Sequence, residues 1–188
     1  MPRDGLSSAL RRLQCIAAML AALGAGIPAA GAQTRPDTQV MRCPAQLPAP
    51  VAAKRQAIKE AASRRDWPAL GKLAAAGFQW GGYEDGDPVP AWRSAADRGE
   101  DPAVPLLAII DMTCVVVRGG DGKTVYTWPS ATGLDWKALT AAEKSALQTL
   151  YGARIDQYWL EGRNKGYYVG WSVGIDPQGN WKSFTIGD

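Results

Sequence analysis

The pattern of apolar and polar positions is most regular near the C-terminus, between residues 167 and 186. Two runs rich in β-branched and aromatic residues, YYVGWSVGI and NWKSFTI, flank residues 176–179, Asp-Pro-Gln-Gly. Aspartate first, proline second and glycine fourth are typical of a type I turn. The stretch therefore predicts a β-hairpin, in which alternation places Trp181, Ser183 and Thr185 on one face of the second strand. A two-stranded hairpin is marginal in water, so the remaining chain must add strands and a helical layer.

Apolar residues at helical spacing predict two helices ahead of the first strand. The first begins at Val51, in the sequence VAAKRQAIKEAASRR, whose apolar positions share one face. We expect Asp66 to cap a second helix and Gly77 to end it. Residues 78–80 then alternate like a short strand and are followed by two glycines. The pair of helices predicts a helical hairpin.

Helix start signals and glycine-rich turns divide the middle of the chain. Aspartate followed by proline predicts a third helix over about residues 87–98. The same signal at Asp101 favours a helix over a strand for the apolar run 104–110. Residues 113–118 and 123–128 read as two strands joined by Gly-Gly-Asp-Gly, which is a second hairpin.

A helical insert separates the two predicted hairpins. Thr140 and Glu143 have the spacing of a capping box, Gly152 ends the helix, and a shorter helix over about 154–160 follows. The predicted fold class is α+β, with an N-terminal helical hairpin packed on a curved antiparallel sheet and this insert ahead of the C-terminal hairpin.

The N-terminal segment has the features of a secretory signal peptide. Arginines precede an apolar stretch over about 13–27, and Ala-Gly-Ala at 30–32 is a cleavage signal. We expect cleavage after Ala32 and a periplasmic or secreted protein, with an uncleaved anchor as the alternative. No later run approaches the roughly 20 apolar residues that a membrane span needs. The domains expected are a signal peptide (1–32), an extended proline-rich arm (33–50) and a single α+β domain (51–188).

Charge and cysteine content narrow the possible partners. The full chain has a formal charge of +3, and loss of the leader's three arginines and one aspartate leaves +1. A nucleic-acid partner would call for a concentrated basic face, so none is predicted. Cys43 and Cys114 remain after cleavage, and in an oxidising compartment we expect a disulfide between them. The alternative is a pair of buried thiols that never meet.

The order of elements resembles a known superfamily. The segment KRQAIKEAASRRDWPALGKLAAAGFQW, the strand TVYTW and the final hairpin are similar to the cone-shaped α+β fold of SnoaL-like and nuclear-transport-factor-like proteins. The insert at 134–166 departs from that pattern. The motif GW-x-x-GI-x-x-x-G-x-W, from Gly170 to Trp181, is similar to small uncharacterised exported proteins of proteobacteria. A Src-homology-three-like small barrel on the C-terminal strands is the alternative fold.

The resemblance directs attention to acidic residues, because enzymes of the cone superfamily place acid and base groups in the cone mouth. The chain has no histidine, which excludes a His-Asp dyad, a Ser-His-Asp triad and a histidine-bearing metal site. Asp111 is a candidate general base if it points inward, and it otherwise lies at a helix end facing water. Glu84, Asp85 and Asp87 form an acidic loop whose carboxylates could raise one another's pKa or bind a hard cation such as calcium. The alternative is that Asp87 caps a helix and Glu84 and Asp85 are ordinary residues of a polar turn.

Tryptophan is the other candidate for a binding site, with eight residues in the chain. Trp92, Trp128 and Trp136 adjoin breaks between elements and are the predicted pocket residues, whereas Trp67, Trp80 and Trp171 are expected to pack in the core. The leading hypothesis is a non-catalytic domain that binds a small apolar molecule or an envelope component, with no cofactor and no metal. The alternatives are a carboxylate-dependent isomerase or hydrolase, and a protein-binding module that uses the C-terminal hairpin as an edge.

Overall fold

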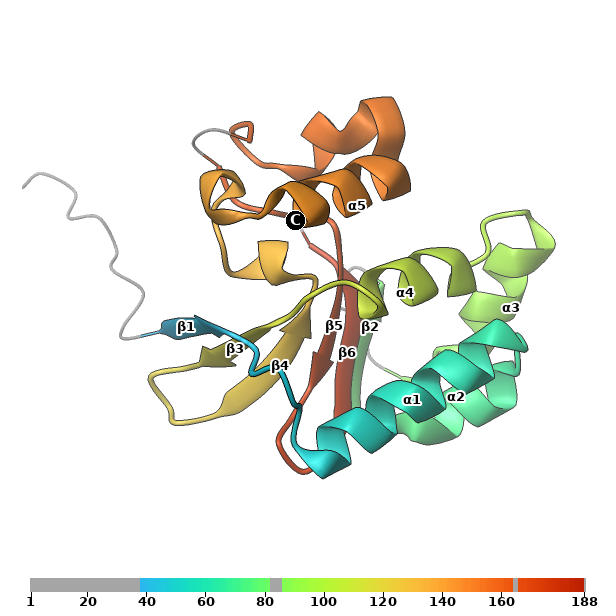
Figure 1. Cartoon of the computed structure of the whole chain (residues 1–188). Helices are drawn as coiled ribbons and strands as arrows, with labels where there is room; N and C mark the ends of the chain where they lie inside the picture. Colours follow the sequence, from blue (N-terminus) through green and yellow to red (C-terminus); the bar gives the residue numbers. More distant parts are fainter. Residues whose placement is uncertain (1–37, 82–85, 164–165, 188) are drawn as a thin grey trace, which may run out of the picture. The chain divides into compact units, whose positions relative to one another are not determined.

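The computed structural model describes residues 38–81, 86–163 and 166–187 (Figure 1). The protein is α+β, as predicted. Its α-helices are α1 (Ala49–Ser63), α2 (Trp67–Leu73), α3 (Val89–Asp97), α4 (Ala103–Ile110) and α5 (Ala141–Tyr151). Its strands are β1 (Gln39–Arg42), β2 (Ala74–Gly81), β3 (Val115–Arg118), β4 (Thr124–Trp128), β5 (Trp171–Ile175) and β6 (Trp181–Ile186). Three short 3-10 helices follow β4: η1 (Ser130–Thr132), η2 (Trp136–Ala138) and η3 (Gly152–Tyr158).

The strands form one open six-stranded sheet in the order β1-β3-β4-β5-β6-β2. The two predicted hairpins, β3–β4 and β5–β6, are confirmed. The sheet is mostly antiparallel, but β2 pairs parallel to β6, which corrects the expectation of an antiparallel sheet. Both strands of the C-terminal hairpin have a neighbour on each side, so this hairpin is neither a small barrel nor a free edge.

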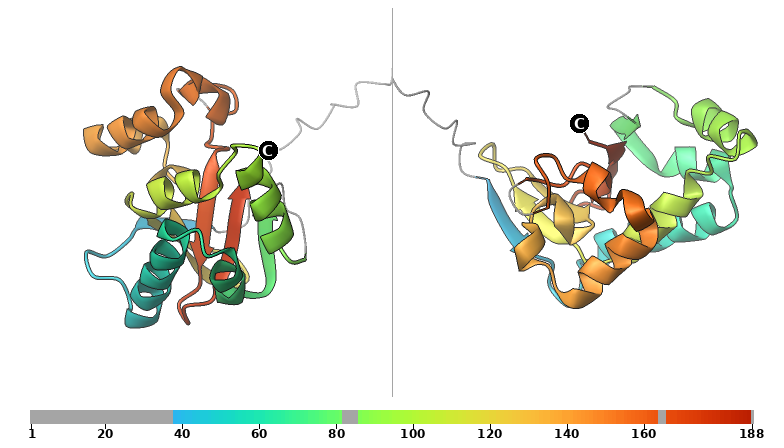
Figure 2. Two further views of the ribbon diagram at one scale, coloured as in Figure 1. Left: turned by 90° about the vertical axis from the view of Figure 1, so that its right-hand side faces the viewer. Right: turned by 90° about the horizontal axis from the view of Figure 1, so that it is seen from above.

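Helices α1, α2 and α4 pack against one another and against the β5 and β2 part of the sheet (Figures 1 and 2). Asp66 caps α2 as predicted, accepting a hydrogen bond from the Ala69 N–H at 3.1 Å. The helix ends at Leu73, however, and β2 begins at once, so Gly77 does not end a helix. Gly77 instead has a positive φ inside β2, where the pairing with β6 shifts register.

An aromatic core lies between these helices and the sheet. Trp181, fully buried on β6, contacts Phe78 at 4.7 Å and stacks on Trp92 at 6.0 Å between ring centroids. Phe184 is also buried, and it faces Trp92 at 6.4 Å. The predicted alternation along β6 is therefore wrong, because a register shift opposite Gly174 and Ile175 lets Trp181 and Phe184 share the buried side.

The C-terminal hairpin begins later than the sequence pattern suggested. Residues 167–170 turn away from the sheet, and Tyr168 forms an isolated antiparallel bridge with Trp159. The backbone N–H of Val169 donates to the Tyr158 carbonyl at 2.9 Å, and Leu160 donates to Tyr167 at 2.9 Å. These bonds tie the end of the helical insert to the start of β5.

The insert forms a second, smaller core, which we call the α5–η3 module (residues 141–158). The predicted capping box is present, and a 3-10 helix takes the place of the shorter α-helix expected over 154–160. Glu143 joins the module to the sheet, since its buried carboxylate accepts hydrogen bonds from Arg42 on β1 and Ser130 in η1, each at 2.6 Å. The Thr140 N–H donates to the same carboxylate at 2.6 Å and Thr113 adds a further donor.

The arm expected over 33–50 is only partly extended coil. It contains β1, which pairs antiparallel with β3, and α1 begins inside it at Ala49. The predicted disulfide Cys43–Cys114 is present, with the Cα atoms 5.4 Å apart, and the Cys43 N–H also donates to the Cys114 carbonyl at 3.0 Å. The expected signal peptide lies outside the described residues. None of the helices in the described part meets the length and hydropathy of a membrane span.

Candidate ligand-binding site

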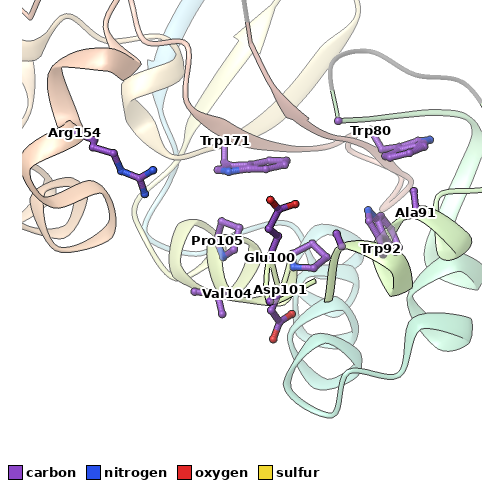
Figure 3. A pocket seen from close by; sticks show the side chains of 13 residues that line it. Trp80, Ala91, Trp92, Glu100, Asp101, Val104, Pro105, Arg154 and Trp171 are labelled. Atoms are coloured by element: carbon purple, nitrogen blue, oxygen red, sulfur yellow. The ribbon is translucent and has the colours of Figure 1, made fainter. Parts of the chain in front are cut away.

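A cleft of about 500 Å³ opens between the sheet and the connection from α3 to α4 (Figure 3). This volume lies within the ~300–1,000 Å³ typical of small-molecule sites. Trp80 on β2 and Trp171 on β5 line the sheet side, and Trp92 on α3 lies below Trp80. The remaining lining comes from the end of β2, both helices, their connection and η3: Gly81, Ala91, Ala95, Gly99, Glu100, Asp101, Pro102, Val104, Pro105 and Arg154.

The tryptophan rings of the cleft are fixed from behind by the aromatic core. Trp171 stacks on Phe184 with 4.7 Å between centroids and 24° between planes. Trp92 stacks on buried Trp181, and its own side chain is 4% exposed. Trp171 therefore reaches the cleft in a set orientation and needs little ordering when a ligand binds, whereas Trp92 is packed on several sides and offers only a small part of its ring to the cleft.

The side of the cleft opposite Trp171 is formed by the start of α4. Asp101 sets this start, accepting from the Ala103 N–H at 2.9 Å and from Arg65 Nε at 2.6 Å. Its carboxylate turns away from the cleft (Figure 3). Val104 and Pro105 present apolar surface instead, and Val104 is 56% exposed, so this wall is open to solvent.

Two groups of opposite charge flank the cleft. The Glu100 carboxylate reaches up toward Trp171, and the Arg154 guanidinium points toward the cleft from η3 (Figure 3). Glu100 is 73% exposed, and the ion pair it makes within the described residues is a long one, 3.4 Å, to Arg98. The cleft thus offers an acceptor from α3–α4 and a donor from the α5–η3 module around an apolar centre.

A closed ring of hydrogen bonds holds Trp171 in place. Its N–H donates to the Tyr151 hydroxyl at 3.0 Å, Tyr151 donates to Tyr168 at 2.6 Å, and Tyr168 donates to the Trp171 carbonyl at 2.9 Å. The β4 pairing ends at Val173, so the two tyrosines supply the partners that a neighbouring strand would give. Burial raises the pKa of Tyr151 to about 12, which keeps the phenol protonated as the ring requires.

Gly170 is required for this ring. A Cβ atom at that position would lie 2.4 Å from the Tyr151 hydroxyl and 2.5 Å from the Tyr168 ring. Both distances are too short for real contacts, so a side chain would push the tyrosines away from the Trp171 backbone. The glycine that precedes Trp171 in the sequence motif is therefore explained by its close packing against the two tyrosines.

The predicted pocket tryptophans are not brought together. Trp92 lines the cleft, but Trp128 is buried in the main core at 1% exposure and borders a separate hollow beside the disulfide. Trp136 packs edge-on against Trp159, with the Arg163 guanidinium 4.9 Å from its ring. Trp80 and Trp171, predicted only to pack, do pack against the main core and also line the cleft. The sequence feature that could have identified these two tryptophans as cleft residues is their position near strand ends, next to glycines.

The acidic candidates lie elsewhere. Asp111 follows the last turn of α4 with its side chain 52% exposed, and it pairs with Arg55 at 3.3 Å and with Lys59. It therefore faces water, the second of the two expected positions. Asp87 accepts from the Val89 N–H at 3.0 Å, but the N-cap of α3 is Pro88, so Asp87 lies one residue ahead of its expected capping position. Glu84 and Asp85 lie outside the described residues.

Comparison of the chain with models of protein families, with curated proteins and with solved structures finds no match. Within residues 38–81, 86–163 and 166–187, no group of three or more histidine, cysteine or acidic side chains is arranged to hold a metal ion. The chemistry of the cleft must therefore be argued from its own geometry.

Proposed function

We propose that this protein is a non-catalytic binding domain that takes a small molecule with an apolar face into the cleft of Trp80, Trp92 and Trp171. The observation that carries the proposal is the convergence of three tryptophans from β2, α3 and β5 on one cleft of about 500 Å³. Apolar walls with a few polar groups at the rim are typical of ligand sites.

An enzyme that depends on Asp111 has less support. That carboxylate is paired with two cations at the surface and is not among the residues that line the cleft. A general base must reach the proton that it removes. A protein-binding role for the C-terminal hairpin has less support still, because its strands lie inside the sheet.

We also propose that the domain is exported and related to the cone-fold superfamily. The disulfide supports an oxidising compartment, and the α+β class with a mostly antiparallel sheet is the fold class that the resemblance implies. Denaturing mass spectrometry of protein isolated from a bacterial periplasm tests export: we expect the mass of a chain beginning at residue 33, less two hydrogens. A full-length mass would contradict it.

Native mass spectrometry of the same preparation tests ligand binding. We expect the wild type to carry a small-molecule adduct. The substitution Val104→Trp should remove the adduct, because this exposed side chain lines the cleft and a larger group would fill it. Met41→Trp is the matched control, since Met41 is 49% exposed and lies on β1, the opposite edge strand from β2. Bare wild-type protein, or an adduct in both variants, would contradict the proposed site.

A further inference from the structure

We infer that the ligand of the cleft is a saccharide, bound with a pyranose ring packed on the tryptophans. This inference rests on the proposed function and names the class of ligand. The inferred ligand is an uncharged ring compound that has C–H groups on its faces and hydroxyls around its edge.

The first argument is the shape of the cleft. Trp171 and Trp80 lie on the sheet side and Val104 and Pro105 on the other, which leaves a slot with aromatic surface along one wall (Figure 3). The face of an aromatic ring is electron-rich, so it attracts the slightly positive C–H groups of a sugar face. The opposite wall is aliphatic and accepts the other face of the ring.

The second argument is the charge around the slot. A carboxylate only accepts hydrogen bonds and a guanidinium only donates them, whereas a hydroxyl does both. A ligand bearing several hydroxyls can therefore donate to Glu100 and accept from Arg154 at once. A cation would be attracted by Glu100 but repelled by Arg154. An anion would be attracted by Arg154 but repelled by Glu100. Opposite charges on the two flanks thus favour a ligand without net charge, and a hydroxyl-rich ring meets that condition.

The third argument is the openness of the site. Val104 is 56% exposed and Glu100 is 73% exposed, so the slot is a surface groove with solvent along its rim. A ring bound there can continue into further units outside. We therefore expect oligosaccharides to bind at least as well as single sugars.

Indole N–H signals in ¹H–¹⁵N spectra provide the test, because the chain has eight tryptophans and each gives one signal. The full protein is titrated separately with cellotetraose, maltotetraose and chitotetraose. We expect at least one of them to shift the signals of Trp80, Trp92 and Trp171, while the signals of Trp128 and Trp136 stay in place. Choline and 1-naphthol serve as a cationic probe and an apolar aromatic probe.

Variants assign the binding to the slot. Val104→Trp should abolish the shifts, and Glu100→Gln and Arg154→Gln should each weaken binding about tenfold by removing a charged hydrogen-bond partner. Glu100 and Arg154 are both exposed, so these two changes leave the core intact. Met41→Trp should bind as the wild type does.

The outcomes separate the inference from the proposed function. Shifts of the cleft signals with naphthol but with none of the saccharides would overturn the saccharide inference and leave a small-molecule site standing. Shifts with choline alone would also overturn it, in favour of a cation site. No shift with any probe would count against both. Saccharide shifts that persist in Val104→Trp would place the sugar elsewhere and refute the inference.

Discussion

The main core and the α5–η3 module are built in different ways. The main core packs α1, α2 and α4 against the sheet through buried apolar side chains, with Trp181, Phe184 and Trp92 at its centre. The module has its own apolar cluster, which meets the main core through Leu150 and Trp171. Two polar contacts also join it to the sheet, the Glu143 carboxylate and the Tyr151–Tyr168 pair. Hydrogen bonds depend on direction, whereas apolar packing does not.

This difference matters for the cleft, because each region supplies part of it. The main core provides Trp80 and Trp92 and backs the Trp171 ring through Phe184. The module contributes Arg154 and Tyr151, which together with Tyr168 binds the Trp171 backbone. Apolar packing alone therefore holds one part of the site, while the Trp171 wall also depends on polar anchors. Substitutions in the two regions should therefore have different effects on the stability of the protein.

The largest effect is expected from Trp181→Ala. The side chain is fully buried among Phe78 and Trp92, and such truncations cost about 4 kcal/mol in the free energy of unfolding. Urea unfolding followed by far-UV circular dichroism measures the loss. Trp136→Ala in η2, which packs against the module's apolar cluster, is the comparison and should cost clearly less, because Trp136 is only half-buried. Equal losses would show that the two regions are not built differently.

Glu143→Ala should cost about 3 kcal/mol, since it leaves the buried Ser130 hydroxyl without its acceptor and removes the ion pair with Arg42, which keeps its bond to the Ala138 carbonyl. The effect should be local. Hydrogen exchange followed by mass spectrometry should show lost protection in residues 141–158 and little change in β5 and β6. Uniform loss across the sheet would contradict a polar anchor that serves the module.

Acid should weaken the same anchor. Burial alone would raise the pKa of Glu143, but hydrogen bonds from Arg42, Ser130, Thr113 and the Thr140 N–H outweigh it and hold the pKa well below the ordinary 4.5. A carboxylate whose pKa is lower in the folded than in the unfolded protein stabilises the fold at pH values above its unfolded pKa. That stabilisation is lost as the pH falls below about 4.5.

The wild-type advantage over Glu143→Gln, measured by urea unfolding at several pH values, should therefore shrink below about pH 4.5. Asp176 also has a lowered pKa, because the hydrogen bonds that it accepts from Asn180 outweigh the effect of burial. Both proteins contain Asp176, so its contribution cancels when their free energies of unfolding are subtracted. A difference that stays constant with pH would contradict the assignment to Glu143.

Sequence patterns predicted the capped helices and the two hairpins, because apolar periodicity and capping residues are local. Asp66, Thr140 and the residues at 176–179 each act within a few positions along the chain. The anchors could not be predicted, since Glu143 reaches Arg42 across 101 residues and Tyr151 reaches Trp171 across 20. The cleft was missed for a similar reason: Trp80 and Trp171 meet only through the parallel pairing of β2 with β6, which no local pattern encodes.

The most direct test of the account is the exchange rate of the Trp171 backbone amide, measured by NMR in the wild type and in Tyr151→Phe. This amide donates to the Tyr151 hydroxyl, and leaving it unpaired should cost about 1–2 kcal/mol. We predict exchange at least about tenfold faster in the variant, with the amides of β6 unchanged and weaker ligand binding in the cleft. Equal exchange at Trp171 in the two proteins would contradict the claim that the tyrosine pair holds the wall of the site.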